Sequence, residues 1–451
     1  MNTIFSINLI KGRIKKIIII NIILFFLIYQ ALFIYGLKIF FYESNSPEYF
    51  QNFAKEIQTT PMEDETVALI KKILVLGHEL YESSEKNGKL FTDSLLLNDK
   101  VKAFVDANSG TIELNIINPL VTSATVETAL STKKIIVKDG YTFNHLRKIF
   151  KVIYIYCVYQ IEKKDKAKVI SGINALTAFY SFSQKGIEGS KPLISCMIST
   201  ALLNLMAEII NKTLESEQLN LTAKELDALF NKLKILPAIS DNFFDYMVYE
   251  KILIKDAIKN YIMFHYNQNF IKMLSTMVTL KTFDLYYGRL TEQYETIMNN
   301  IIDLKNKPYP EVIKNVQIIQ KDLEYSHLSI FTSKYHPIIL IVVPSCQKAY
   351  TMDIISRLKL KGILIKILAL KEKILTGKVP QTIDELKKVS GYNNPEFNIA
   401  IDDFTQKPLI YRVSETGEIL IYSAGPDIID NGGKFSSEKQ SYQKTGIDIK
   451  L

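Results

Sequence analysis

The sequence lacks the patterns that identify most enzymes and cofactor-binding proteins. Of its five histidines, none stands three or four residues from another. At His78 and Glu79, where a zinc protease helix needs a second histidine at position 82, the chain carries Glu82. No phosphate-binding P-loop, nucleophile elbow or dinucleotide-binding glycine fingerprint is present. These absences favour a non-enzymatic protein and leave open an enzyme whose site is assembled from distant residues.

Cysteine is also scarce, with only Cys157, Cys196 and Cys346 in the chain. An odd number excludes a closed disulfide framework, and none of the three has the spacing of a metal site. Each lies in an apolar run, where a free cysteine packs as a small hydrophobic residue. We expect three structural thiols, with a Cys157–Cys196 bridge as the alternative in an oxidising compartment.

A strong charge imbalance is missing as well. The 451 residues include 55 Lys and Arg against 47 Asp and Glu, and Lys11, Arg13, Lys15 and Lys16 alone can account for four of the eight excess charges. A nucleic-acid partner requires basic residues clustered on one face and a reading module, and neither is found. We therefore expect no nucleic-acid binding. The hydrophobic content of 47% is sufficient for two or three domains with cores of their own.

The strongest positive signal is an uncharged segment near the start. Residues 1–16 are short and basic, and residues 17–37 follow without a charged side chain. A helix of this length, rising about 1.5 Å per residue, crosses a hydrocarbon core of about 30 Å. Residues 38–46 are aromatic and bulky and offer no signal-peptide cleavage site. The sequence predicts an uncleaved transmembrane anchor, with residues 1–16 in the cytoplasm and the rest beyond the membrane.

The central part, residues 43–330, has helical periodicity throughout and predicts an array of antiparallel helix pairs. Residues 143–180 predict one helical hairpin, and Thr222 with Glu225 forms a capping box that begins another helix. Residues 192–207 are uncharged but too short for a membrane span, so we expect a buried core helix. No fixed repeat with a recurring signature is present, which argues against a tetratricopeptide array.

Residues 337–451 predict a long helix followed by a small β module. Pro344 is expected to end a short apolar segment, after which a helix of roughly thirty residues follows. Its apolar stripe is opposed by basic residues, namely Arg357, Lys361, Lys366 and Lys371. Gly377 fits the C-terminal cap of this helix.

Beyond Gly377, Thr382 and Glu385 form a second capping box. Two strands, at residues 408–413 and 418–422, are separated by a turn and predict an antiparallel hairpin. The fold class predicted from the whole chain is mainly α, with a transmembrane helix, a multi-helical body and a small C-terminal α+β module.

A resemblance to a known family is found in this last part. It rests on the long helix and on the following residues: Gly377, Pro380, Thr382, Leu386, Asp402, Phe404, Pro408, Leu409, Tyr411, Tyr422, Ser423, Gly425, Asp427 and Asp448. Together they resemble the periplasmic half of the major pseudopilin of type II secretion. Residues 377–451 are also similar to the C-terminal segment of a group of membrane-anchored bacterial proteins with long helical bodies, and residues 146–236 resemble that group in outline. The resemblance implies a bacterial inner-membrane protein with its bulk in the periplasm.

The resemblance also implies a calcium site. Pseudopilins coordinate calcium in this loop, so Asp427, Asp430 and Asp448 are the implied ligands, completed by backbone carbonyl groups. Calcium takes six to eight oxygen ligands, and Gly432 and Gly433 permit a tight turn. The spacing differs from that of an EF-hand, so a site requires the chain to fold back and bring Asp448 alongside. The alternative is a turn made of residues that favour turns.

The chain departs from pseudopilins at its N-terminus, which lacks the glycine processing site and the glutamate that follows it. A long helical body also separates the anchor from the loop, so filament formation is not expected. We predict a non-enzymatic, membrane-anchored envelope scaffold with a calcium-stabilised C-terminal module. The alternatives are an accessory component of a type II secretion or pilus-like system, and an envelope enzyme with a site that sequence motifs do not reveal.

Overall fold

The computed structural model describes residues 65–86, 97–122, 142–185, 193–236, 243–252, 294–325, 337–389, 399–435 and 446–451. The predicted cytoplasmic tail and the transmembrane anchor lie outside these ranges. The chain divides into two compact units, and the second, residues 60–251 and 297–451, holds nearly all of the described residues. Within the described ranges, no helix combines the length and the apolarity needed to cross a bilayer.

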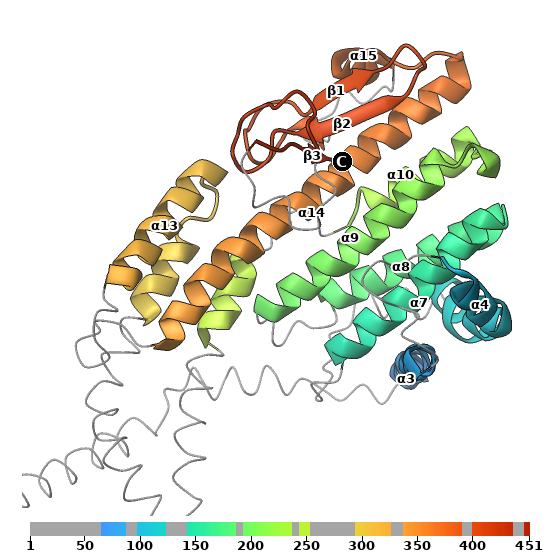
Figure 1. Cartoon of the computed structure of the whole chain (residues 1–451), viewed down its shortest axis with the longest axis horizontal. Helices are drawn as coiled ribbons and strands as arrows, with labels where there is room; N and C mark the ends of the chain where they lie inside the picture. The colour runs from blue at the N-terminus through green and yellow to red at the C-terminus, as the bar shows by residue number, and fades with distance from the viewer. Residues whose placement is uncertain are drawn as a thin grey trace, which may run out of the picture. The chain divides into compact units, whose positions relative to one another are not determined.

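The described residues are mainly helical, as predicted, with a small antiparallel sheet (Figure 1). The helices are α3 (Glu65–Lys86), α4 (Asp99–Ile112), the π-helical turn η1 (Glu113–Ile117), α5 (Asn118–Thr122), α7 (Thr142–Glu162), α8 (Lys166–Lys185), α9 (Leu193–Glu215), the 3-10 turn η2 (Glu217–Leu219), α10 (Ala223–Leu233), α13 (Tyr309–Tyr325), α14 (Pro337–Thr376) and α15 (Ile383–Val389). Residues 243–252 and 294–302 are also helical. The strands are β1 (Ile410–Val413), β2 (Ile419–Ser423) and β3 (Ile449–Lys450).

Two local predictions for the body are confirmed. The hairpin consists of α7 and α8, joined by a tight turn in which Asp165 N donates to the carbonyl of Gln160 at 3.0 Å. The capping box at the start of α10 is complete, because Glu225 N donates to Thr222 Oγ1 and Thr222 N donates to the Glu225 carboxylate. Local hydrogen bonding therefore fixes where these helices turn and begin.

Two parallel helices, α9 and α14, form the centre of the second unit. The predicted core helix is found as α9, with Leu202 and Met206 fully buried. Asn204 of α9 donates to Ser356 of α14, and farther along both helices Lys366 Nζ donates to Glu215 at 2.8 Å. Helix α14 also packs against α10, α13 and β2, so helices and sheet share it as a common support (Figure 1).

The prediction that Pro344 ends an apolar segment is wrong. Helix α14 runs without interruption from Pro337 through Pro344 to Thr376, a length of 40 residues. Proline at the first helical position is favourable, whereas an interior proline costs about 3 kcal/mol through one lost hydrogen bond and a steric clash. Contacts of α14 with its neighbours offset this local penalty, as tertiary packing commonly does.

The basic residues opposite the apolar stripe of α14 are paired with acidic side chains. Arg357 and Lys361 are only 7% and 6% exposed. Lys366 pairs with Glu215 of α9, and Lys371 pairs with Asp227 of α10 at 2.7 Å. Helical periodicity separates apolar from polar positions but does not distinguish water from an acidic partner. In this fold the basic side chains connect α14 to its neighbours.

Helix α7 connects to neighbouring helices through buried phenol groups. Three of its tyrosines donate to carboxylates, in the pairs Tyr154–Glu208, Tyr156–Glu113 and Tyr159–Asp106. Burial, reinforced by the adjacent carboxylate, raises the pKa of Tyr154 and of Tyr156 far above the usual value. These phenols therefore stay protonated and act as hydrogen-bond donors, which satisfies polar groups at the helix interfaces.

The three cysteines are buried and form no disulfide bond. This confirms the prediction of three structural thiols over the alternative of a Cys157–Cys196 bridge. Burial raises the pKa of Cys157 and Cys346 well above the ordinary thiol value. The Sγ atom of Cys157 fills the space beside Gly172 of α8, where an added Cβ would come within 2.3 Å of it. These thiols serve packing, since nucleophilic or metal-binding cysteines require the thiolate.

Leu451, the residue that follows β3, packs against α14 at Gly362. A Cβ added at Gly362 would lie 2.4 Å from the Cβ of Leu451, whereas one added at Gly110 of α4 would meet no atom within 4 Å. Both glycines are helical and Gly110 is exposed. Close packing at only one of two helical glycines allows a matched test.

We expect Gly362→Ala to lower the free energy of unfolding by about 1–3 kcal/mol through overpacking. Gly110→Ala should raise it by about 0.5–1 kcal/mol, because alanine favours the helix. Urea denaturation of the full chain and both variants measures the two changes. Equal effects of the two substitutions would contradict the close packing of Leu451 on α14.

Candidate functional site

The C-terminal module begins where α14 ends. Gly377 adopts a left-handed conformation at φ +75°, and its N–H closes the helix on the Lys373 carbonyl at 2.9 Å. Thr382 caps α15 by accepting from Glu385 N at 3.0 Å. The Glu385 carboxylate accepts from Gln381 N, one residue before the position expected for a capping box. The predicted helix end and helix start are therefore both confirmed.

The predicted hairpin is found as β1 and β2, which pair antiparallel from Ile410 opposite Tyr422 to Val413 opposite Ile419. Its turn is closed by Ser414 N, which donates to the Glu418 carbonyl at 2.9 Å. The third strand, β3, pairs antiparallel with β2 and was not predicted. With two residues it is too short to show alternation in the sequence.

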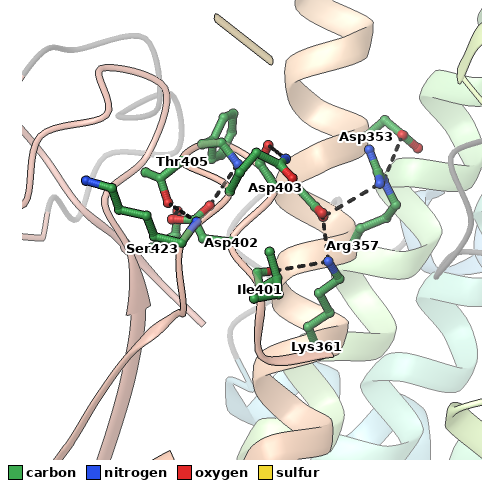
Figure 2. Close-up of polar contacts among 11 residues, drawn as sticks. Asp353, Arg357, Lys361, Ile401, Asp402, Asp403, Thr405 and Ser423 are labelled. Carbon is green, nitrogen blue, oxygen red and sulfur yellow. Dashed lines mark hydrogen bonds and ion pairs between the residues drawn. The ribbon is translucent and has the colours of Figure 1, made fainter. Parts of the chain in front are cut away.

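The module is attached to α14 by buried charges (Figure 2). Lys361 Nζ donates to Asp403 Oδ1 at 2.7 Å and to the carbonyl of Ile401 at 3.1 Å. Arg357 Nη1 lies 3.6 Å from Asp403 Oδ2, and Arg357 Nε donates to Asp353 of the same helix at 3.2 Å. We refer to Asp353, Arg357, Lys361 and Asp403 as the junction cluster. Buried charges of this kind are retained only with partners, so the cluster fixes the position of the module.

Asp402 faces the opposite way, into the module. Its carboxylate accepts from Phe404 N and from Ser423 Oγ, both at 2.9 Å, and the residue is 2% exposed. Burial raises the pKa of Asp402, although these hydrogen bonds act in the opposite direction. Two adjacent aspartates thus have separate tasks, since Asp402 shapes the loop and Asp403 holds it to α14.

Aromatic rings surround the same junction. Phe404 contacts Tyr309 of α13 edge to face, with ring centroids 4.6 Å apart. Tyr309 stacks on Tyr350 of α14 at 5.9 Å, and Tyr350 contacts Phe243 and Phe244 at 5.0 and 5.4 Å. Because Phe404 follows Asp403 directly, these ring contacts hold the loop next to the junction cluster against α13 and α14.

Asp448, one of the three predicted calcium ligands, lies alongside the loop at residues 427–434, as a metal site would require. Its carboxylate accepts backbone N–H groups from Asn431 at 3.1 Å, Gly433 at 2.7 Å and Lys434 at 3.2 Å. Asp448 is only 3% exposed. The carboxylate therefore closes the loop through three backbone donors.

The other two predicted ligands behave similarly. Asp427 accepts from Ile429 N at 3.2 Å and from Gly446 N at 2.6 Å. Asp430 Oδ1 accepts from Gly432 N and from the hydroxyl group of Tyr422, at 2.8 and 3.1 Å. The fold brings all three aspartates into one loop region, where each supports a turn.

The fit of calcium to this loop is mixed. Aspartate oxygens have the right chemistry for the ion. Among the described residues, however, no group of three or more His, Cys, Asp or Glu side chains is arranged to hold a metal. Calcium binding at Asp427, Asp430 and Asp448 stays a prediction.

Comparisons with known proteins do not assign this chain to a family. No protein-family model, curated protein or solved structure matches it. The functional proposals below rest on the geometry of the module and its junction.

Asp402 and Asp403 were not singled out as functional residues from the sequence. The sequence offered two signals. One was the adjacent acidic pair before Phe404, which is fully buried in the structure. The other was the spacing of Asp353, Arg357 and Lys361 at intervals of four residues. Such spacing places three charges on one face of a helix. The partner on a distant segment is recognised only in the folded chain.

We expect Asp403→Asn to lower the free energy of unfolding by about 3 kcal/mol, because Lys361 and Arg357 would keep buried charges without a full counter-charge. Asp384→Asn serves as the control, since its pair with Lys387 is on the surface and the Asp384 side chain is 85% exposed. That variant should change stability by less than about 1 kcal/mol. Similar urea midpoints for the two variants would contradict the role of the junction cluster.

The raised pKa of Asp402 predicts a pH dependence of stability. A carboxyl group whose folded pKa exceeds the unfolded value binds its proton more tightly in the folded state, so it costs stability when ionised. Asp402→Asn removes this titration, so the difference in melting temperature between the variant and the native chain should depend on pH. The variant should compare more favourably with the native chain at pH 7 than at pH 3.5, because ionised Asp402 costs stability only in the native chain. Melting curves of both proteins from pH 7 to pH 3.5 measure this difference, and a change in the opposite direction on acidification would contradict the assignment.

Proposed function

We propose that this protein is a non-enzymatic envelope scaffold, anchored in a bacterial inner membrane by residues 17–37, with the helical body and the C-terminal module in the periplasm. The observation that carries the proposal is the attachment of the module to α14 through the junction cluster. Lys361 and Arg357 are buried and directed at Asp403 of the module. These charges hold two parts of one chain in a fixed arrangement, which is what a scaffold requires.

The use of polar groups in the body supports the same proposal. The buried phenols of α7 donate to carboxylates of other helices, and the basic residues of α14 pair with acidic residues of α9 and α10. Catalytic groups generally line a pocket with some of their bonding capacity directed at a substrate. The groups named here are directed at one another.

A second candidate is an accessory component of a type II secretion or pilus-like system. It is favoured by one observation, namely that a long helix, α14, is followed by the short helix α15 and then by a small antiparallel sheet with an aspartate-rich loop. That order is the one implied by the pseudopilin resemblance. A scaffold of this kind would present its module to a partner of the secretion system.

The proposed location is tested with two reporter fusions after Leu451 in the full chain. Alkaline phosphatase, which folds only outside the cytoplasm, should be active, and green fluorescent protein exported in the same way should be dark. Replacing three leucine or isoleucine residues of the segment 17–37 by lysine should release the protein from membranes, because each charge is costly at the centre of a bilayer. A fluorescent, membrane-free fusion of the native chain would overturn the proposed location.

We propose calcium as a further ligand of the loop at Asp427, Asp430 and Asp448. Calcium should raise the melting temperature of the full chain relative to chelator, because an ion that binds only the folded state stabilises it. Asp430→Asn can keep the hydrogen bonds from Gly432 and Tyr422 while it removes one anionic charge. This variant should melt like the native chain in chelator and lose the calcium effect, whereas identical melting of the native chain in both buffers would refute the site.

A further inference from the structure

The loop at residues 427–434 contains an asparagine that is followed by a glycine, Asn431 and Gly432. In such a pair the main-chain nitrogen of the glycine can attack the side-chain carbonyl carbon of the asparagine and displace ammonia, because glycine has no side chain to block the approach. The sequence has one other pair of this kind, Asn87 and Gly88, which lies outside the described residues. The speed of the reaction depends on what surrounds the two groups.

Gly432 leaves the reacting nitrogen accessible. The residue is exposed at φ +76°, and a Cβ added to it would meet no atom of the described residues within 4 Å. The reaction closes a small ring that contains the Gly432 nitrogen and the side-chain carbon of Asn431. That ring has room on the open side of the turn.

A carboxylate is already in contact with the nitrogen that would attack. The N–H group of Gly432 donates to Asp430 Oδ1 at 2.8 Å. A general base must lie within about 2.6–3.2 Å of the atom from which it takes a proton. The hydroxyl group of Tyr422 donates to the same oxygen at 3.1 Å, and Arg412 lies 3.8 Å from the other oxygen. Groups outside the turn therefore hold Asp430 in the position of a base.

The side chain of Asn431 is held in the same turn. Its main-chain nitrogen donates to Asp448 Oδ1 at 3.1 Å, and its side-chain Nδ2 donates to the Ile429 carbonyl at 2.8 Å. An unfolded chain samples many positions of this side chain. Holding both reacting groups and the base in one turn removes that entropy cost before the reaction starts.

The charges of the loop act in both directions. Arg412 donates to the Gly432 carbonyl at 3.3 Å, and its positive charge favours the negative charge that develops on the Gly432 nitrogen. Asp427 and Asp448 oppose that charge, although N–H groups donate to both carboxylates. Because these two effects oppose each other, the contact between Asp430 and Gly432 is the feature that decides.

We propose that Asn431 is a self-modification site, at which the fold promotes conversion to aspartate or isoaspartate with Asp430 as the base. Asp430 takes the proton of the Gly432 nitrogen, which forms a bond to Asn431 Cγ. The bond from Cγ to Nδ2 breaks, and ammonia leaves with the proton. Water then opens the ring at one of its carbonyl groups. One water enters and one ammonia leaves without oxidation or reduction, and the loop gains a carboxylate.

The test compares the rate of conversion in the folded chain with the rate in the same chain unfolded by guanidinium chloride. Freshly purified full chain is incubated with chelator at pH 7 in water enriched in oxygen-18, and its peptides are analysed by mass spectrometry. The heavy oxygen marks conversion that takes place during the incubation. We expect Asn431 to convert about tenfold faster in the folded chain, because only there are the base and both reacting groups held together.

Two exposed asparagines of the same chain serve as internal controls. Asn220 and Asn306 precede Leu221 and Lys307, whose side chains block the approach of the main-chain nitrogen. Both should stay unmodified over the same period. A rate at Asn431 that is equal or lower in the folded chain would overturn the proposal, because the fold would then give no assistance.

Asp430→Asn tests the base. The new side chain can still accept from Gly432 and Tyr422 through its amide oxygen, but it does not take up a proton. Asn431 of this variant should convert no faster when folded than when unfolded, whereas Asp384→Asn, on the surface of α15, should keep the native rates. A native rate in folded Asp430→Asn would also overturn the proposal. The comparison within the native chain decides the matter even where the variant does not fold.

Conversion to aspartate changes the contact with Ile429. The Nδ2 donor at 2.8 Å from the Ile429 carbonyl is replaced by a carboxylate oxygen, so two acceptors face each other. Asn431→Asp should therefore melt below the freshly purified native chain in chelator, and the aged native chain should shift in the same direction. A melting temperature of Asn431→Asp at or above the native value would contradict this effect.

A second consequence rests on the proposed calcium site. The new carboxylate and the Ile429 carbonyl together offer further oxygen ligands to a calcium ion. Calcium should therefore raise the melting temperature of Asn431→Asp more than that of the native chain, and an equal rise would contradict the added ligand. No calcium effect in either protein would refute the calcium site, whereas the conversion is decided separately, by mass and in chelator.

Discussion

The structure depends on a set of buried charges at the side of one long helix. Arg357 and Lys361 of α14 are removed from water, which is costly unless each finds a counter-charge, and Asp403 of the C-terminal module supplies it. The same helix pairs Lys366 with α9 and Lys371 with α10. Helix α14 is therefore the element that joins the helical body to the sheet.

Attachment of the module has a consequence for its far loop. Asp402 shapes the segment next to the junction and bonds Ser423 at the end of β2, and the chain then passes into the turn that carries Ile428. Asp448, the residue before β3, accepts a hydrogen bond from Gly433 of that turn. Leu451, the residue after β3, packs beside Gly362 of α14. A continuous set of contacts thus leads from the junction cluster to the loop at residues 427–434. A rigid support of this kind allows Ile428 to keep a left-handed conformation, at φ +63°.

Local chemistry explains what the sequence could predict. The capping box at Thr222, the cap at Gly377 and the hairpin of β1 and β2 each depend on residues a few positions apart, and all are found in the structure. The partners of Arg357 and Lys361 could not be predicted, because periodicity does not distinguish a buried acid from water. Of the candidate site, the sequence identified the aspartates of the loop and missed Asp403. Strand β3 was missed because two residues carry no alternation.

The central claim is that α14 and the C-terminal sheet form one cooperative unit, joined by the junction cluster. Native-state hydrogen exchange of the full chain, resolved by peptide, tests it most directly. The account predicts that amides of β2 and of the middle of α14 open with the same free energy, and that Asp403→Asn lowers both values together. Fast exchange of β2 in the native chain, with α14 still fully protected, would contradict it.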